Sequence, residues 1–240
     1  MSSPRARASA RDGHKPTLTL GEPPYTPGAV SPLCAGPARN ETPLDWYESD
    51  VQALEDGLRA KPPPANSVAF YGSSSIRLWS TLTGDFPDVP VVNLGFGGST
   101  LAACSWFYWR IVRPVAPRAL VLYAGDNDIG DGSPPAHLVS QLQFLLHQVD
   151  VTFPDLPVSV LSIKPSPARW HLVARIEEAN QGMQRLIVRR NRGLWLNVFD
   201  AMLVDGRPRS ELFCEDGLHL SAEGYRLWTQ IVRQNRPAAF

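Results

Sequence analysis

The chain has 240 residues, of which 43% are hydrophobic and 19% are charged. This length accommodates one sizeable α/β domain, and the composition is ordinary for a water-soluble globular protein. The 23 basic and 23 acidic residues balance to a formal net charge of zero, so the charge favours no nucleic acid as a partner. The three cysteines stand at wide spacing, which predicts no zinc ribbon or disulfide framework and favours a reducing, cytoplasmic location.

The sequence predicts one domain flanked by two tails. Residues 1–42 are rich in Pro, Gly, Ala, Ser and Arg without sustained periodicity, so we expect a flexible N-terminal tail. The folded domain is expected over residues 43–236 and a short C-terminal tail over residues 237–240. Thr42 is placed to cap a first helix, with Pro43 at its first position. No apolar run reaches the roughly 20 residues of a membrane span, and no apolar signal region opens the chain.

The expected elements alternate between strand and helix. Short apolar runs typical of buried strands occupy residues 68–71, 91–94, 119–124, 158–163 and 194–199. Helices are expected over residues 43–60, from residue 76, over 101–112, 134–149 and 170–192, and from residue 221. Residues 82–90 are expected to form a loop. Nearly continuous apolar strands separated by helices predict a five-stranded parallel sheet in a three-layer α/β/α sandwich.

Polar blocks follow the predicted strands. In parallel sheets, ligands bind at the carboxyl ends of the strands, where these blocks would gather. The blocks are Gly72–Ser75, Gly95–Thr100 and Gly125–Asp128, and Asp216–His219 precedes the last helix. A hydroxyl, a glycine-rich turn, an amide and a carboxylate–histidine pair are the parts needed for acyl transfer through a serine nucleophile.

These blocks resemble the SGNH/GDSL hydrolases in content and order. They read GSSSI at 72–76, NLGFGGST at 93–100, GDND at 125–128 and DGLH at 216–219, and the resemblance covers about residues 44–236. The run LSIKPSPARW at 161–170 is similar to one bacterial subgroup that carries GSSSI as its first block. The resemblance implies a flavodoxin-like sandwich, esterase or lipase-like chemistry and no cofactor or metal.

The resemblance also implies roles for particular residues. Ser74 would be the nucleophile, His219 its general base and later its acid, and Asp216 the group that orients the imidazole. The oxyanion hole would consist of the backbone N–H groups of Ser74 and Gly98 and the side-chain amide of Asn127.

One position departs from the family pattern. Ser73 stands where the family usually carries Asp before the nucleophile, which puts in doubt any local bonding that the carboxylate provides. Ser73 or Ser75 attacking in place of Ser74 is the alternative, although the family's spacing favours Ser74.

The sequence indicates the residues that would contact a substrate less specifically than it indicates the catalytic residues. Lys164, Arg169 and Trp170 are candidates for reading the polar part of a substrate, or else form a positively charged loop surface. An aromatic group, Trp106, Phe107 and Trp109, would wall an acyl pocket or pack helix against sheet.

The same residues allow other interpretations. Gly95-x-Gly97 lacks the third glycine of a dinucleotide fingerprint, and Asp126 and Asp128 are better explained as turn residues than as a calcium or phosphatase site. A Cys214–His219 nucleophile pair is conceivable, but Cys214 follows Phe213 and is expected to be a small core residue.

The expected function is hydrolysis of a small-molecule O-acyl ester, short-chain or acetyl, through an acyl-serine intermediate. The alternatives are an acyltransferase with the same residues, an inactive binding domain of the same fold, and a metal-dependent phosphatase built on Asp126 and Asp128.

Overall fold

A computed structural model describes residues 44–235, and within this range a five-stranded sheet has the strand order β2-β1-β3-β4-β5. Every neighbouring pair of strands is parallel. The predicted tails, the Thr42 cap and Pro43 lie outside the described residues. The predicted flavodoxin-like parallel sandwich is therefore confirmed.

The strands of the main sheet are β1 (Val68–Gly72), β2 (Val91–Gly95), β3 (Ala119–Tyr123), β4 (Val158–Leu161) and β5 (Gly193–Leu196), and a separate hairpin pairs β6 (Leu203–Val204) with β7 (Arg207–Pro208). The helices are α1 (Glu48–Ala60), α2 (Ser74–Arg77), α3 (Leu82–Asp85), α4 (Leu101–Ile111), α5 (Asp126–Gly130), α6 (Pro135–Thr152), α7 (Val173–Ile187) and α8 (Ala222–Gln234). Short 3-10 turns are η2 (Leu44–Tyr47), η3 (Arg113–Val115), η4 (Pro167–Leu172), η5 (Asp200–Met202) and η6 (Ser210–Leu212).

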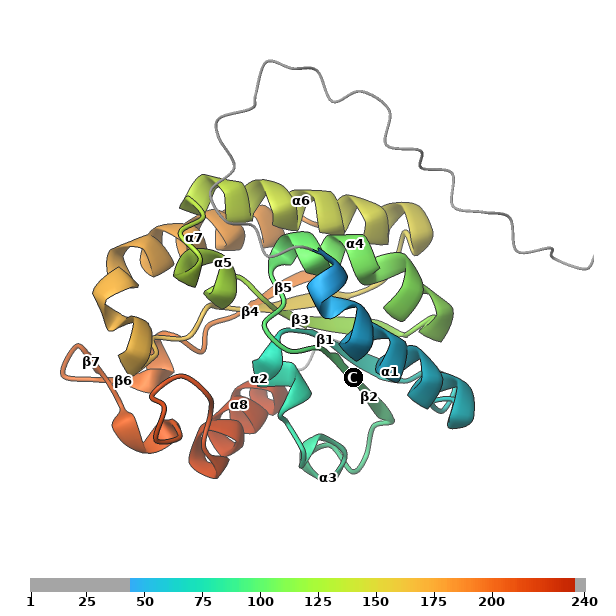
Figure 1. Cartoon of the computed structure of the whole chain (residues 1–240), viewed down its shortest axis with the longest axis horizontal. Coiled ribbons are helices and arrows are strands. Elements are labelled where there is room, and N and C mark those ends of the chain that lie inside the picture. Colours follow the sequence, from blue (N-terminus) through green and yellow to red (C-terminus); the bar gives the residue numbers. More distant parts are fainter. Residues whose placement is uncertain (1–43, 236–240) are drawn as a thin grey trace, which may run out of the picture. The chain divides into compact units, whose positions relative to one another are not determined.

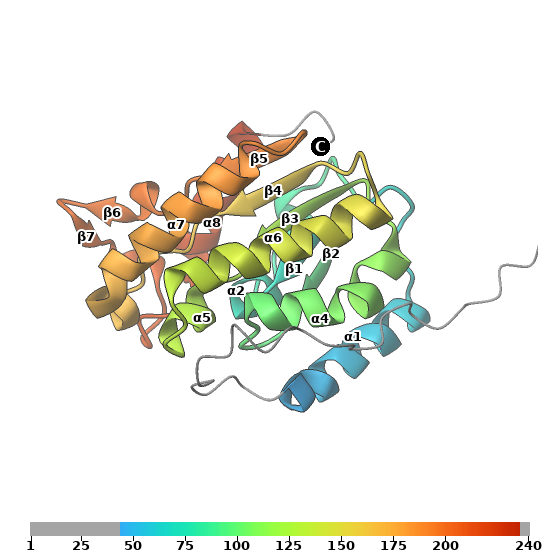
Figure 2. The same cartoon turned by 90° about the horizontal axis from the view of Figure 1, so that it is seen from above.

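Helices cover both faces of the sheet (Figure 1). One face carries α4, α6 and α7, with α1 beside α4, and Figure 2 looks onto this layer. The other face carries α2, α3 and α8. In β1, Ala69 and Tyr71 join the first core and Val68 and Phe70 join the second, because successive side chains of a strand point to opposite faces.

The helices differ from the sequence expectation in three places. The short helix α3 lies inside the predicted loop 82–90. The long helix expected over 170–192 is divided into η4 and α7, with a kink at Arg169, and it ends at Ile187 so that Gly193 can pair with Val158. The turn predicted at Asp126 is the short helix α5. Turn and helix propensities are weak priors that such tertiary pairing overrides.

Candidate active site

A chain of hydrogen bonds joins three of the predicted residues. His219 Nε2 lies 3.1 Å from Ser74 Oγ, and His219 Nδ1 lies 2.6 Å from Asp216 Oδ2. Because the carboxylate accepts the Nδ1 hydrogen, the neutral imidazole presents its Nε2 lone pair to the hydroxyl. This arrangement suits removal of the Ser74 proton.

Backbone groups hold the Asp216 carboxylate in place. Its Oδ1 atom accepts the N–H groups of Leu218 and His219, each at 2.9 Å. These bonds, from the Leu218 N–H first and then from the His219 side chain and N–H, lower the pKa of Asp216 to about 2. The carboxylate therefore stays ionised at neutral pH, where it can stabilise a protonated imidazole.

Gly72 positions the serine block against strand β3. Its φ is +137°, and a Cβ atom there would lie 1.9 Å from the carbonyl oxygen of Tyr123. Only glycine fits such an approach. The turn makes Ser74 the first residue of α2 and leaves it partly exposed, whereas Ser73 and Ser75 are buried. Among the three serines, Ser74 is the one hydrogen-bonded to His219 in the described residues.

The Gly98 turn is tied to the start of the domain. Tyr47 donates its hydroxyl hydrogen to the Gly98 carbonyl at 3.2 Å, and the Gly97 N–H donates to Asp50 Oδ2 at 3.0 Å. Gly98 has a φ of +66°, and a Cβ atom there would lie 3.0 Å from the indole of Trp46. Sequence reasoning missed these contacts, since nothing local in residues 46–50 points to a turn some fifty positions away.

The GDND block ties the same turn from the other side. Asn127 Nδ2 donates to the Ser99 carbonyl at 3.1 Å, and Asp128 accepts the Leu101 N–H at 3.1 Å. Within residues 44–235, no acceptor faces the backbone N–H groups of Ser74 or Gly98. The Asn127 amide and the Asp128 carboxylate therefore hold the segment that follows Gly98.

Lys164 is buried and does not lie at the surface. Its side chain is about 2% exposed, and its ammonium group contacts the Asp126 carboxylate and the Tyr123 hydroxyl. The expectation that Lys164 contacts substrate or forms a charged surface is corrected here, because an ammonium with no exposed surface must satisfy its charge internally.

Arg169 and Trp170, unlike Lys164, are only partly buried. The Arg169 guanidinium pairs with Asp126 Oδ1 at 2.7 Å and donates to Asn127 Oδ1 at 3.2 Å. Trp170 is half-buried, with the Arg207 guanidinium 5.9 Å from the centre of its ring. Arg169 thus contacts the GDND block directly, and Trp170 stands over the β6–β7 hairpin.

The three aromatic residues of α4 that were candidates for a pocket wall differ in burial. Phe107 is buried in the core, Trp109 packs partly against it, and Trp106 is 56% exposed. The expectation for Cys214 is also corrected: this residue is exposed, because the loop before His219 runs along the surface with the Cys214 N–H bonded to the His219 carbonyl.

Both Asp126 and Asp128 are buried and occupied by protein donors. Burial raises the pKa of Asp128 to about 7, and its carboxyl group already accepts the Leu101 N–H. Residues 44–235 contain no cluster of three or more His, Cys, Asp or Glu side chains arranged for a metal ion.

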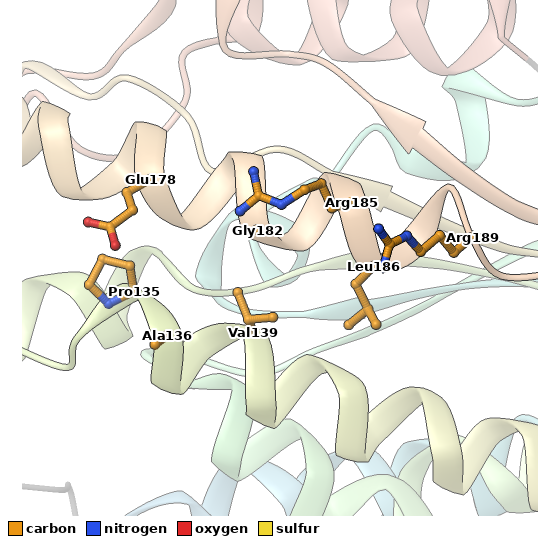
Figure 3. Close-up of a pocket in the computed structure, with 8 residues that line it drawn as sticks. All are labelled: Pro135, Ala136, Val139, Glu178, Gly182, Arg185, Leu186 and Arg189. Atoms are coloured by element: carbon orange, nitrogen blue, oxygen red, sulfur yellow. The ribbon is translucent and has the colours of Figure 1, made fainter.

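A hollow in the described part of the chain is separate from this site. It has a volume of about 410 Å³ and lies between α6 and α7 (Figure 3), lined by residues such as Val139, Glu178 and Arg185. None of its lining residues belongs to the hydrogen-bonded chain described above.

Within residues 44–235, no helix combines the length and the hydrophobicity needed to cross a membrane.

Ser74 follows strand β1 of the parallel sheet and is hydrogen-bonded to His219, which is bonded in turn to Asp216. Residues 45–227 match the GDSL-like Lipase/Acylhydrolase family, and the chain belongs to this family. Its chemistry is ester hydrolysis in general terms. No curated protein sequence matches the chain.

Several solved structures share the fold. A Streptococcus pneumonia protein, described provisionally as a platelet activating factor, is 22% identical with a TM-score of 0.71, over 80% of this chain and 93% of that one. A GDSL-like lipase from Bacteroides thetaiotaomicron is 18% identical with a TM-score of 0.68, over 78% and 96%. A carbohydrate esterase family 3 protein from Talaromyces cellulolyticus is 16% identical with a TM-score of 0.57, over 69% and 93%.

Proposed function

We propose that the protein is a serine esterase that hydrolyses an O-acyl ester through an acyl-serine intermediate. The observation that carries this proposal is the continuous hydrogen-bonded chain from Ser74 through His219 to Asp216. A serine hydroxyl is a weak nucleophile until an adjacent base accepts its proton, and the base needs a third group to orient it.

In the first half-reaction, Ser74 Oγ attacks the ester carbonyl carbon while His219 Nε2 takes the hydroxyl proton. The carbonyl oxygen becomes an oxyanion, held by the N–H groups of Ser74 and Gly98 and by the Asn127 amide. His219 then gives its proton to the alcohol oxygen as the ester C–O bond breaks. In the second half-reaction, His219 deprotonates a water molecule that attacks the acyl carbon. The bond between that carbon and Ser74 Oγ then breaks, His219 returns the proton to Ser74, and the acyl group leaves as the carboxylic acid.

The anchoring of the Gly98 turn supports the oxyanion hole. Donors stabilise a transition state best when they are oriented before the reaction, and one such donor is worth about 2.7–4 kcal/mol. Tyr47 holds this turn on one side and Asn127 holds it on the other, so little reorganisation is needed when charge develops.

We propose a short acyl group and water as acceptor. The proposal of a short acyl group is supported by the burial of Phe107 in the core, since this side chain adds no wall to a pocket at the surface. The side chains of His219 and Asp216 are 31% and 48% exposed, which leaves the base open to water and favours hydrolysis over transfer to a second alcohol. An acyltransferase or an inactive binding domain of the same fold remains the alternative that the experiment addresses.

The experiment compares native protein with Ser74→Ala on p-nitrophenyl esters of increasing acyl length, with and without a chelator. We expect turnover that is fastest on acetyl and propionyl esters, insensitive to the chelator and reduced at least about 10³-fold in the variant. Ser140→Ala is the matched control, because this exposed serine lies in α6 and bonds only to the Ala136 carbonyl within the described chain. Equal activity of native protein and Ser74→Ala would reject the proposal, and labelling of Ser74 by a phosphonate would identify the nucleophile.

A further inference from the structure

We propose that Arg169 is a positioning residue that fixes the orientation of the Asn127 side-chain amide and, through it, one donor of the oxyanion hole. This inference rests on the proposed function for its catalytic consequence. It replaces the sequence-based expectation that Arg169 contacts the substrate.

The orientation problem arises from the shape of the amide. The oxygen and the NH2 group of an asparagine are nearly the same size, so only its partners decide which of them faces the reaction centre. Arg169 Nη2 lies 3.2 Å from Asn127 Oδ1, and a guanidinium can only donate. The amide oxygen must therefore face Arg169, and the NH2 group faces the Ser99 carbonyl at 3.1 Å. That bond uses one amide hydrogen and leaves the second for an oxyanion.

A buried charge cluster holds the guanidinium itself. Its Nη1 atom is 2.7 Å from Asp126 Oδ1, and the other oxygen of this carboxylate contacts Lys164. Burial disfavours the charge on Asp126, yet Lys164 and Arg169 outweigh it and hold the pKa of Asp126 below its ordinary value. The cluster therefore stays ionised, and Arg169 has a fixed anchor one residue before the amide that it orients.

The backbone around Arg169 is shaped to allow this contact. Arg169 departs from helical geometry inside η4, with φ −114° and ψ 16°. A Cβ atom at Gly130 would lie 2.7 Å from Arg169 Nε. The Arg169 side chain can therefore pass close to α5 at this position because Gly130 has no side chain. The same turn donates the Ala168 N–H to the Gly217 carbonyl at 3.0 Å. It thereby also contacts the loop that carries His219.

Charge balance distinguishes this role from a purely structural ion pair. Lys164 alone would neutralise Asp126, so a second cation on the same carboxylate is not required for its burial. Arg169 brings what a lysine cannot, a planar fork that reaches Asp126 with one nitrogen and Asn127 with the other.

The test is a double-mutant cycle between Arg169→Met and Asn127→Ala, measured as kcat and KM on a p-nitrophenyl ester. We expect Arg169→Met to lower kcat by about 10- to 100-fold with KM within about twofold, because the lost interaction acts in the transition state. In the Asn127→Ala background the same substitution should lower kcat less than about threefold. Arg169→Lys keeps the charge and the contact with Asp126 and should recover only part of kcat. Arg175→Met is the control, because Arg175 bonds the Gly132 and Ser133 carbonyls nearby, and its kcat should not change.

Opposite results have distinct meanings. A higher KM with unchanged kcat would make Arg169 a substrate contact, and fully additive losses in the double variant would separate it from Asn127; either result overturns the proposal. A readout independent of catalysis is the NMR signal pair of the Asn127 NH2 group, identified through its absence in Asn127→Ala. We expect two exchange-protected signals, shifted from those of a solvated amide, in native protein and in Arg175→Met. In Arg169→Met we expect signals that move toward the shifts of a solvated amide and lose their protection from exchange. Unchanged signals in Arg169→Met would overturn the proposal about Arg169, whether or not the protein hydrolyses an ester. A lack of ester hydrolysis by native protein would count against the proposed function alone.

Discussion

His219 Nε2 lies 3.1 Å from Ser74 Oγ, although 145 positions separate the two residues in the chain. The fold creates this contact by packing α8, which follows the His219 loop, on the same sheet face as α2. A second bond supports it, since Tyr225 in α8 donates its hydroxyl hydrogen to the Ser75 carbonyl at 3.0 Å. The relative position of base and nucleophile thus depends on the packing of two helices.

Replacing Asp216 with Asn should lower kcat about 10³- to 10⁴-fold, because an amide cannot stabilise the protonated imidazole and favours the wrong tautomer. Asp205→Asn, in the exposed β6–β7 turn, is the control and should retain native kcat. Steady-state kinetics on a p-nitrophenyl ester measure both. A loss below tenfold in Asp216→Asn would mean that Asp216 does not orient His219.

The acid dependence follows from the lowered pKa of Asp216, about 2 against an ordinary value of 3.8. A carboxyl whose pKa is depressed by folding stabilises the folded state above its unfolded pKa, and this contribution is lost as pH falls through the folded pKa. We therefore expect Asp216 to remain charged down to about pH 2. Titration followed by the carboxyl carbon signal in NMR would check this, and a midpoint near 4 would contradict it.

Tyr47→Phe should lower kcat by about fivefold, with a small fall in the melting temperature. The substitution keeps the aromatic packing but removes the bond to the Gly98 carbonyl, and a hydrogen bond contributes about 1 kcal/mol. Tyr71→Phe is the matched control, because it removes a hydroxyl bonded to the Cys104 carbonyl inside the core. Tyr71→Phe should lower stability without lowering kcat. A fall in kcat for Tyr71→Phe but not for Tyr47→Phe would show that the Tyr47 hydroxyl does not position the Gly98 turn.

Gly72→Ala should lower the free energy of unfolding by about 3 kcal/mol or more. The new Cβ atom would lie 1.9 Å from the Tyr123 carbonyl oxygen at a φ of +137°, so strand β1 or β3 must shift. Gly57→Ala is the control, since Gly57 lies in α1 with nothing within 4 Å of a Cβ atom. It should stabilise the protein by about 0.5–1 kcal/mol. Urea unfolding measures both, and equal stability of the two variants would contradict this reading of the turn.

Asp128→Asn should remove one source of pH-dependent stability. Burial raises the pKa of Asp128 from 3.8 to about 7, so the folded state binds a proton that the unfolded state releases between these values. The stability of native protein relative to Asp128→Asn should therefore fall as pH rises from about 4 to about 7, by up to about 4 kcal/mol. Paired urea unfolding curves across this range measure the difference. A constant difference would show that Asp128 is ionised throughout.

Much of the fold follows from local patterns. Uninterrupted apolar runs such as 119–124 predict buried parallel strands, and the confirmed β3 is fully buried along its length. Ser221 predicts a helix start by its side-chain chemistry, and it accepts the Gly224 N–H at the first turn of α8. Such features depend on residues a few positions apart, so sequence alone reveals them.

The candidate site depends both on residues that the sequence identifies and on contacts between segments that are distant in the chain. The identities of Ser74, Asn127 and His219 are readable in the sequence, as are the places of the first two after predicted strands and of His219 before the last helix. The partners that orient them are not: Tyr47 on Gly98, Arg169 on Asn127 and Tyr225 on the α2 turn come from distant segments. Lys164 shows the same limit, because a lysine beside prolines predicts an exposed loop, whereas its burial is possible only next to Asp126.

By itself, the sequence therefore determined the layer architecture, the order of strands and helices and the chemical groups between them, since backbone periodicity and turn chemistry act over a few residues. The ends of β4 and β5 lie two and three residues before the predicted ones. Only the tertiary structure decided which groups touch, which charges are buried and which way the Asn127 amide points. Those outcomes depend on long-range packing and on pairing of buried polar groups, whose free energies exist only once the segments have met.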